Sequence, residues 1–184
     1  MITLSTKAQS ELPFYEIPDF PGDYSSGNVL ARMIDGLGYR YHWASEGLTE
    51  TDLNYKPSEE GRTTLQTLEH IHGLTLTIKN AAAGKPTVRN SNPQSYDYKE
   101  LRELTLQNLM EARTSMINKT AEELESMLLS FQSGDQTSDF PLWILINGPI
   151  ADAIYHTGQI VSFRRSSGNP VDSKMNVFTG KNRK

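Results

Sequence analysis

Two residues that can bind a metal ion or move a proton lie four residues apart near the C-terminus. The stretch GPIADAIYHTGQIVSFRR, residues 148–165, carries Asp152 and His156 among many apolar residues. In a helix, this spacing puts both side chains on the same face. A carboxylate on a largely covered helix face costs free energy unless it is paired, hydrogen-bonded or bound to a metal. Asp152 and His156 are therefore a hydrogen-bonded pair, a catalytic pair, or two ligands of one metal ion.

A complete metal site needs at least one more ligand from elsewhere in the chain. The sequence has four histidines and no cysteine, so the ligands are restricted to His, Asp, Glu or backbone oxygen. Helical bundles build metal sites from side chains on facing helices. His70, in the segment TLEHIHGL, is the leading candidate for the third ligand, and His42 is the alternative. His72 lies about 200° round the helix from His70, so both cannot point into one site.

Two imidazoles and one carboxylate leave a coordination position for water or a substrate, as in catalytic zinc sites. The same ligands match the facial set of non-haem iron enzymes, so the ligand types alone do not name the metal. Gln159 follows His156 by three residues, and we expect it either to orient that imidazole or to pack between helices. Tyr41, His42 and Tyr155 are predicted to line the pocket.

Composition argues against several other classes of protein. A chain of 184 residues with 36% hydrophobic residues is long enough for one domain with a core. Its formal net charge of −4 gives no general attraction to nucleic acids or anionic membrane surfaces. No segment approaches the roughly 20 apolar residues of a membrane span, and the N-terminus lacks the apolar part of a secretory signal. We therefore expect a cytoplasmic protein with neither a nucleic-acid nor a membrane partner.

The spacing of apolar residues predicts four long helices as the framework for these side chains. They span about 25–47, 63–83, 98–118 and 141–165. The connections are predicted to be loops, apart from a short helical or extended piece near 120–129, and no segment has the alternation of a strand. Residues 1–24 are expected to form an extended arm, and residues 171–184 a polar tail. The sequence thus predicts an all-α, single-domain four-helix bundle with long connections.

Local signals mark the ends and irregularities of these helices. Thr63 and Gln66 have the spacing of a capping box at the start of the second helix. Pro149, inside the last helix, predicts a kink or a locally broken turn. Gly36 and Gly38 either weaken the first helix by up to about 1 kcal/mol each or let a neighbour approach closely.

Three segments resemble the DinB-like, or YfiT-like, superfamily of metal-dependent enzymes. The resemblance covers about residues 27–171, and its segments are IDGLGYRYHWASEGL, TLEHIHGL and GPIADAIYHTGQIVSFRRSSGNP. The most specific part is the H-x-G-Q motif from His156 to Gln159, continuing into Arg164, Arg165 and the GNP sequence. The resemblance implies a bundle of up-down-down-up type with a divalent metal ion at one end.

The resemblance also implies which residues hold the ion. The common pattern uses three histidines, one on the second helix and two that are one turn apart on the last helix. His70 and His156 match two of these positions, but the remaining position holds Asp152. The implied cofactor is zinc or nickel, with iron or manganese as alternatives. The negative charge of Asp152 would make the bound ion a weaker Lewis acid.

The activities implied by the resemblance include transfer of a low-molecular-weight thiol, such as bacillithiol or mycothiol, to an electrophile. We therefore expect a metal-dependent S-transferase or hydrolase acting on a small molecule. The alternative is a non-catalytic bundle with a vestigial metal site, because Asp152 departs from the common pattern. Such a protein would act through self-association or partner binding. Apolar helix faces and the N-terminal arm favour a homodimer in either case.

Overall fold

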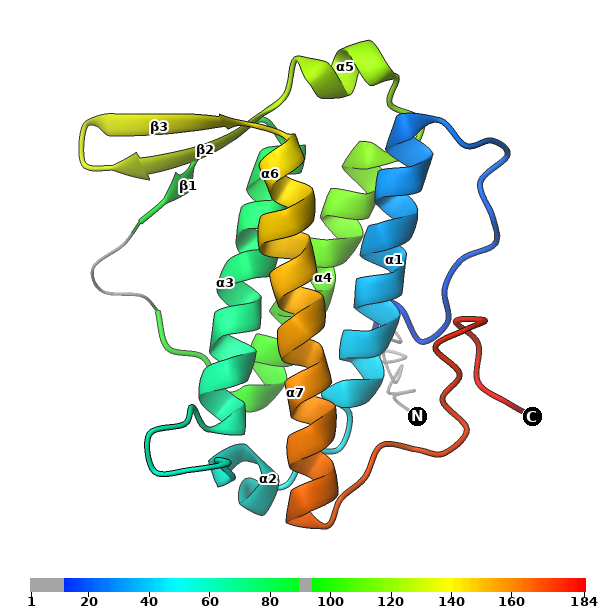
Figure 1. The fold of residues 1–184 in the computed structure, drawn as a ribbon, viewed down its shortest axis with the longest axis vertical. Coiled ribbons are helices and arrows are strands. Elements are labelled where there is room, and N and C mark those ends of the chain that lie inside the picture. Colours follow the sequence, from blue (N-terminus) through cyan, green and yellow to red (C-terminus); the bar gives the residue numbers. More distant parts are fainter. Residues whose placement is uncertain (1–11, 90–93) are drawn as a thin grey trace, which may run out of the picture.

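Four long helical segments dominate the structure, a computed structural model that describes residues 12–89 and 94–184. They are α1 (Ser26–Ala44), α3 (Thr64–Ala82), α4 (Tyr98–Met116) and a C-terminal segment ending in α7 (Ala151–Ser167). Figure 1 shows them side by side, with α1 and α7 running in one direction and α3 and α4 in the other. Helices α1 and α3 each pack against both α4 and α7. The helix that carries His70 is therefore next to the helix that carries Asp152 and His156. The mostly helical architecture predicted from the sequence is confirmed.

The predicted capping box at the start of α3 is present. The Thr63 hydroxyl accepts a hydrogen bond from the backbone N–H of Gln66, and the Gln66 side chain accepts one from the backbone N–H of Thr63. These bonds satisfy two N–H groups that the first helical turn would otherwise leave without partners. The end of α7 also follows a sequence signal, because Gly168 ends this helix with a positive φ of 94°. These signals mark where α3, which carries His70, begins and where α7, which carries His156, ends.

The prediction of a protein without strands was wrong. A three-stranded sheet contains β1 (Thr87–Val88), β2 (Leu128–Ser133) and β3 (Gln136–Pro141), in the order β1-β2-β3. Strands β2 and β3 form an antiparallel hairpin that projects beside the helices in Figure 1. Every residue of β3 is exposed and only Leu129 of β2 is buried, so the sequence lacks the alternation that marks a half-buried strand. The hairpin thus combines backbone pairing with core contacts of Leu129 and Phe131 of β2, whereas β3 stays exposed.

Two short helices occupy the connections. Helix α2 (Glu50–Asn54) lies in the segment expected to be a polar loop, and Thr49 and Asp52 form its capping box. Helix α5 (Ala121–Glu125) falls within the piece expected to be helical or extended. A five-residue helix buries too few apolar side chains to produce a periodic pattern, so only the capping residues of α2 could have indicated it.

The C-terminal helical segment contains an irregular turn around its proline. It begins with α6 (Trp143–Leu145), passes through the π-helical turn η1 (Ile146–Ile150) and continues as α7. Pro149 lies inside η1 and lacks the N–H group that a regular α-helix requires. The predicted break at Pro149 is therefore a π turn. Pro141, expected to begin the helix, instead ends β3.

The described part of the arm, residues 12–24, packs with the tail on α1, and the rest of the predicted arm lies outside the described residues. Ile17 of the arm is buried with Tyr39 and Trp43 of α1, and Val171 and Met175 of the tail pack against them. The backbone N–H of Ile17 donates to the carbonyl of Gly180 at 2.8 Å. Residues 171–184 are thus a docked segment and not only a polar tail. In residues 12–89 and 94–184, no helix has the length and apolar character needed to cross a membrane.

Candidate metal centre

The structure brings His70, Asp152 and His156 together between α3 and α7. The Nε2 atom of His70 lies 3.3 Å from Asp152 Oδ2, and the Nε2 atom of His156 lies 3.3 Å from Asp152 Oδ1. One potential ligand atom from each residue lies within 4.8 Å of the others. Donor atoms about 2.1 Å from a shared ion at tetrahedral angles are about 3.4 Å apart. The three side chains are therefore close to a ligand geometry.

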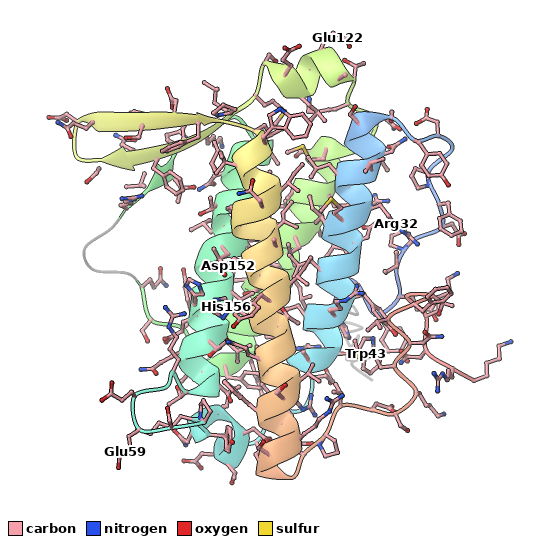
Figure 2. All side chains as sticks on the ribbon, in the orientation of Figure 1. Arg32, Trp43, Glu59, Glu122, Asp152 and His156 are labelled. Atoms are coloured by element: carbon pink, nitrogen blue, oxygen red, sulfur yellow. The ribbon has the colours of Figure 1, made fainter. Side chains whose placement is uncertain are left out.

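The site is open to solvent on the flank of the protein. The side chain of His156 is 13% exposed, that of His70 is 32% exposed and that of Asp152 is 42% exposed. In Figure 2, Asp152 and His156 lie part-way along the C-terminal helical segment and face α3. The expectation that the metal site lies at one end of the bundle was wrong. The π turn directly precedes α7, so it determines the direction in which the first turn of α7 presents Asp152.

Gln159 contacts the imidazole of His156, which agrees with the first of its two predicted roles. Its Oε1 atom lies 2.7 Å from Nδ1 of His156, which is a short hydrogen bond. When Gln159 accepts this bond, His156 carries its proton on Nδ1 and directs the lone pair of Nε2 toward Asp152. A hydrogen bond of this kind fixes the tautomer and the orientation of a metal-ligating histidine.

The donor chemistry of the cluster fits a cation. With His156 in this tautomer, its Nε2 lone pair faces a carboxylate oxygen only 3.3 Å away. Two electron-rich atoms at this distance repel each other unless a positive charge lies between them or a proton is added. Imidazole nitrogen and carboxylate oxygen are both ordinary ligands of zinc, nickel, iron and manganese. His70, Asp152 and His156 therefore fit a divalent ion.

Comparisons with known proteins support the fold. No family model matches the sequence, and no curated protein matches it. The structure is similar to the crystal structure of a DinB-like protein, YjoA, from Bacillus subtilis, with a TM-score of 0.56 and 14% sequence identity. The match covers 76% of this chain and 92% of that chain. The chain has a DinB-like fold.

Within this DinB-like fold, Tyr155 is the predicted pocket residue that contacts the candidate ligand His156. The two rings are roughly perpendicular, with their centroids 5.3 Å apart. Tyr155 is 65% exposed, so a large part of it is available to a molecule approaching the site. Tyr155 lies three residues after Asp152 and follows the same helix face.

Tyr41 and His42 lie elsewhere, so their prediction as pocket residues was wrong. Tyr41 is fully buried on α1, and this burial raises the pKa of its hydroxyl. His42 is buried under the arm, where its Nδ1 lies 2.8 Å from the carbonyl oxygen of Pro13. The sequence places both residues on an apolar helix, but helix periodicity does not say which neighbouring helix each residue faces.

His72 lies away from the site, as its angular position predicted. Its Nδ1 is 3.2 Å from Oγ1 of Thr105 on α4, and its ring contacts Tyr96. Burial lowers the pKa of His72, and the charge of Lys79 adds to this effect. His70 and His72 thus face opposite neighbours of α3 and cannot bind the same ion.

The part of the sequence motif that follows Gln159 has a structural role in the DinB-like fold. The Arg164 guanidinium donates to the carbonyl oxygens of Trp43, Ala44 and Glu46, at the C-terminal end of α1. It also donates to Asn169, which in turn donates to Asp52. Arg164 thereby joins α1 to the end of α7. Arg164 follows Ile160 by four residues, so helical spacing was the sequence signal that placed it on the covered face of α7.

Proposed function

We propose that the protein binds one divalent metal ion through His70, Asp152 and His156 and uses it in a reaction on a small molecule. The observation that carries this proposal is the convergence of three potential ligand atoms within 4.8 Å, from two helices that are far apart in sequence. The DinB-like fold agrees with it, but a match at 14% identity supports the fold alone. We propose zinc or nickel as the ion, as the resemblance to DinB-like proteins implies, with iron and manganese as alternatives, because imidazole and carboxylate ligands bind all four.

The reaction we propose is transfer of a thiol to an electrophile, with hydrolysis as the alternative. A divalent ion bound here would supply Lewis acidity, which lowers the pKa of a coordinated thiol or water. Gln159 would hold the His156 imidazole in the orientation needed for binding. Asp152 would offset part of the charge of the ion. The solvent-exposed side of the cluster, beside Tyr155, would admit the substrate.

Elemental analysis of the protein purified without an affinity tag tests metal binding directly. We expect close to one divalent ion per chain, and its loss in Asp152→Ala and His156→Ala. His72→Gln is the matched control, because this histidine lies on the same helix as His70 but faces Thr105. Absence of bound metal, even after exposure to zinc, nickel, manganese and iron(II), would contradict the proposal. So would retention of the ion by both ligand variants.

Exposed apolar side chains favour self-association as a second function, with or without a metal. The end of β3 and the start of α6 expose Phe140, Trp143 and Ile144, and the side chain of Trp143 is 77% exposed. An exposed apolar cluster of this kind is typical of a protein–protein contact. We propose that it contributes to a homodimer. Sedimentation equilibrium should give a dimer for the wild type and a monomer for Trp143→Ser, whereas a monomeric wild type would exclude this function.

A further inference from the structure

The ligand that an incoming molecule meets first is the carboxylate of Asp152. Its side chain is 42% exposed, against 32% for His70 and 13% for His156. The two imidazoles therefore lie deeper between α3 and α7, and the negatively charged group lies nearer to solvent. The charge of the approach to the site thus depends strongly on Asp152.

The residues one helical turn from the ligands, on the same helix faces, carry no charge. Apart from Asp152 itself, no residue three or four positions from His70, Asp152 or His156 is Lys, Arg, Asp or Glu. Glu69 directly precedes His70, but the helical repeat puts it about 100° round α3 from that side chain.

The basic residues on the same two helices lie away from the opening. Lys79 forms an ion pair with Glu111 on α4, and Arg164 is buried against the end of α1. Arg165 is exposed, but it follows Asp152 by 13 residues, which is about 20 Å along the helix. None of these three residues can balance the charge of Asp152 at the opening.

We propose that this site takes a small neutral or cationic molecule, and that it disfavours molecules bearing carboxylates. The proposal rests on the proposed metal function and specifies its substrate class. A dication with two neutral imidazoles and one carboxylate carries a net charge of +1. One anionic donor, such as a thiolate, cancels this charge. A further carboxylate on the same molecule then gains no attraction from the site and is repelled by Asp152.

Tyr155 adds a preference for a cationic or aromatic group. Its ring is roughly perpendicular to the imidazole of His156, and the residue is 65% exposed. The face of an aromatic ring attracts cations and stacks on other rings. Asp152 and Tyr155 together favour an aromatic or positively charged molecule that presents a thiol or a similar donor to the ion.

Cobalt(II)-loaded protein and three para-substituted benzenethiols test this preference. The substituents are carboxylate, methyl and trimethylammonium, and each is too far from the sulfur to chelate the same ion. The change in cobalt absorption on titration at pH 8 gives each dissociation constant. We expect the carboxylate probe to bind about tenfold more weakly than the trimethylammonium probe. Asp152→His should make the two affinities equal or reverse their order, and Tyr155→Leu should weaken binding of the trimethylammonium probe.

The control and the contrary outcomes separate this proposal from the proposed metal function. Asp172→Asn removes an exposed acid beyond the end of α7 and should leave the affinity ratio unchanged. Equal or tighter binding of the carboxylate probe by the wild type would overturn the charge preference while leaving metal binding intact. A ratio that does not change in Asp152→His would also overturn it. If the protein binds no cobalt(II), the proposed function fails, and this inference fails with it.

Discussion

The Nδ1 atom of His156 lies 2.7 Å from the Oε1 atom of Gln159, one turn further along α7. One ring nitrogen of this candidate ligand is thus held by the protein, and the other faces Asp152 and His70. Replacing Gln159 with Leu removes the hydrogen bond and leaves the imidazole free to change tautomer and rotate. We expect metal affinity to fall about 10- to 100-fold, as measured by competition with a chromophoric chelator.

Gln159→Glu is the matched variant for this prediction. A glutamate can accept the same hydrogen bond from Nδ1 and strengthens the ligand as an electron donor. It should therefore bind the metal at least as tightly as the wild type. Equal affinities for the Leu and Glu variants would show that Gln159 only packs between the helices.

Arg164 should contribute strongly to stability, although it lies within the motif that suggested a metal enzyme. Its guanidinium satisfies three carbonyl groups at the end of α1, and these would be left buried without partners in Arg164→Met. We expect the free energy of unfolding in urea to fall by about 3 kcal/mol. Arg165→Met is the control, since this neighbouring side chain is exposed and should change stability by less than about 0.5 kcal/mol. Similar losses in both variants would contradict this role.

The sequence predicted the cluster of candidate ligands because their relationship is mostly local. The spacing of Asp152, His156 and Gln159 follows from the helical repeat alone, and the contacts of His156 with Asp152 and with Gln159 both occur. His70 lies on a different helix, and its selection rested on the expectation that bundles place ligands on facing helices and on the resemblance to a known family. The long helices could be predicted for the same local reason, since each buries an apolar stripe of helical period.

Most features that the sequence did not predict depend on contacts between distant segments, and one is an exposed local hairpin. The hairpin of β2 and β3 is exposed, so its pairing leaves no alternating pattern. Tyr41 and His42 face α4 and the arm because of how the helices assemble, which periodicity cannot specify. The tail looks polar, but Val171 and Met175 find partners on α1 and the arm. Apart from the hairpin, these contacts join segments far apart in sequence, so local pattern could not reveal them.

Asp52 should make the protein sensitive to acid. Burial raises the pKa of its carboxyl group, but hydrogen bonds from Asn169, Ser167 and Thr49 outweigh this effect and lower the pKa from 3.8 to about 2. The charged form is therefore favoured in the folded state. Its contribution to the free energy of unfolding is complete above about pH 4 and is lost as the pH falls toward 2. The loss should be about 2 kcal/mol.

Urea unfolding between pH 2 and pH 5 measures this contribution. Asp52→Asn should be less stable than the wild type at pH 5, and its stability should fall less between pH 4 and pH 2. Glu50→Gln is the matched control, because it removes an exposed carboxyl group from the same short helix without touching these hydrogen bonds. An acid dependence in Asp52→Asn as steep as that of the wild type would contradict the assignment.

Gly38 lets the arm approach α1 closely, and this contact should respond to a single methyl group. A Cβ atom at position 38 would lie within 2.6 Å of three ring atoms of Phe14, which is buried there with a positive φ of 64°. Gly38→Ala should therefore displace Phe14 and reduce the free energy of unfolding by about 1–3 kcal/mol. At Gly36, the new Cβ would meet only the flexible end of Arg40, at 3.3 Å. Gly36→Ala should consequently stabilise the helix by up to about 1 kcal/mol.

The fluorescence of Trp43 reports on the same contact, because its indole N–H donates to the carbonyl of Tyr15 in the arm. In a Trp143→Phe background, Trp43 is the only tryptophan. Displacement of the arm by Gly38→Ala should expose Trp43 and shift its emission to longer wavelength, whereas Gly36→Ala should leave the emission unchanged. If Gly38→Ala keeps both the stability and the emission of the parent, the close packing of Phe14 on α1 is not what holds the arm. The contacts of Ile17 with the tail would then be the stronger attachment, since they do not involve position 38.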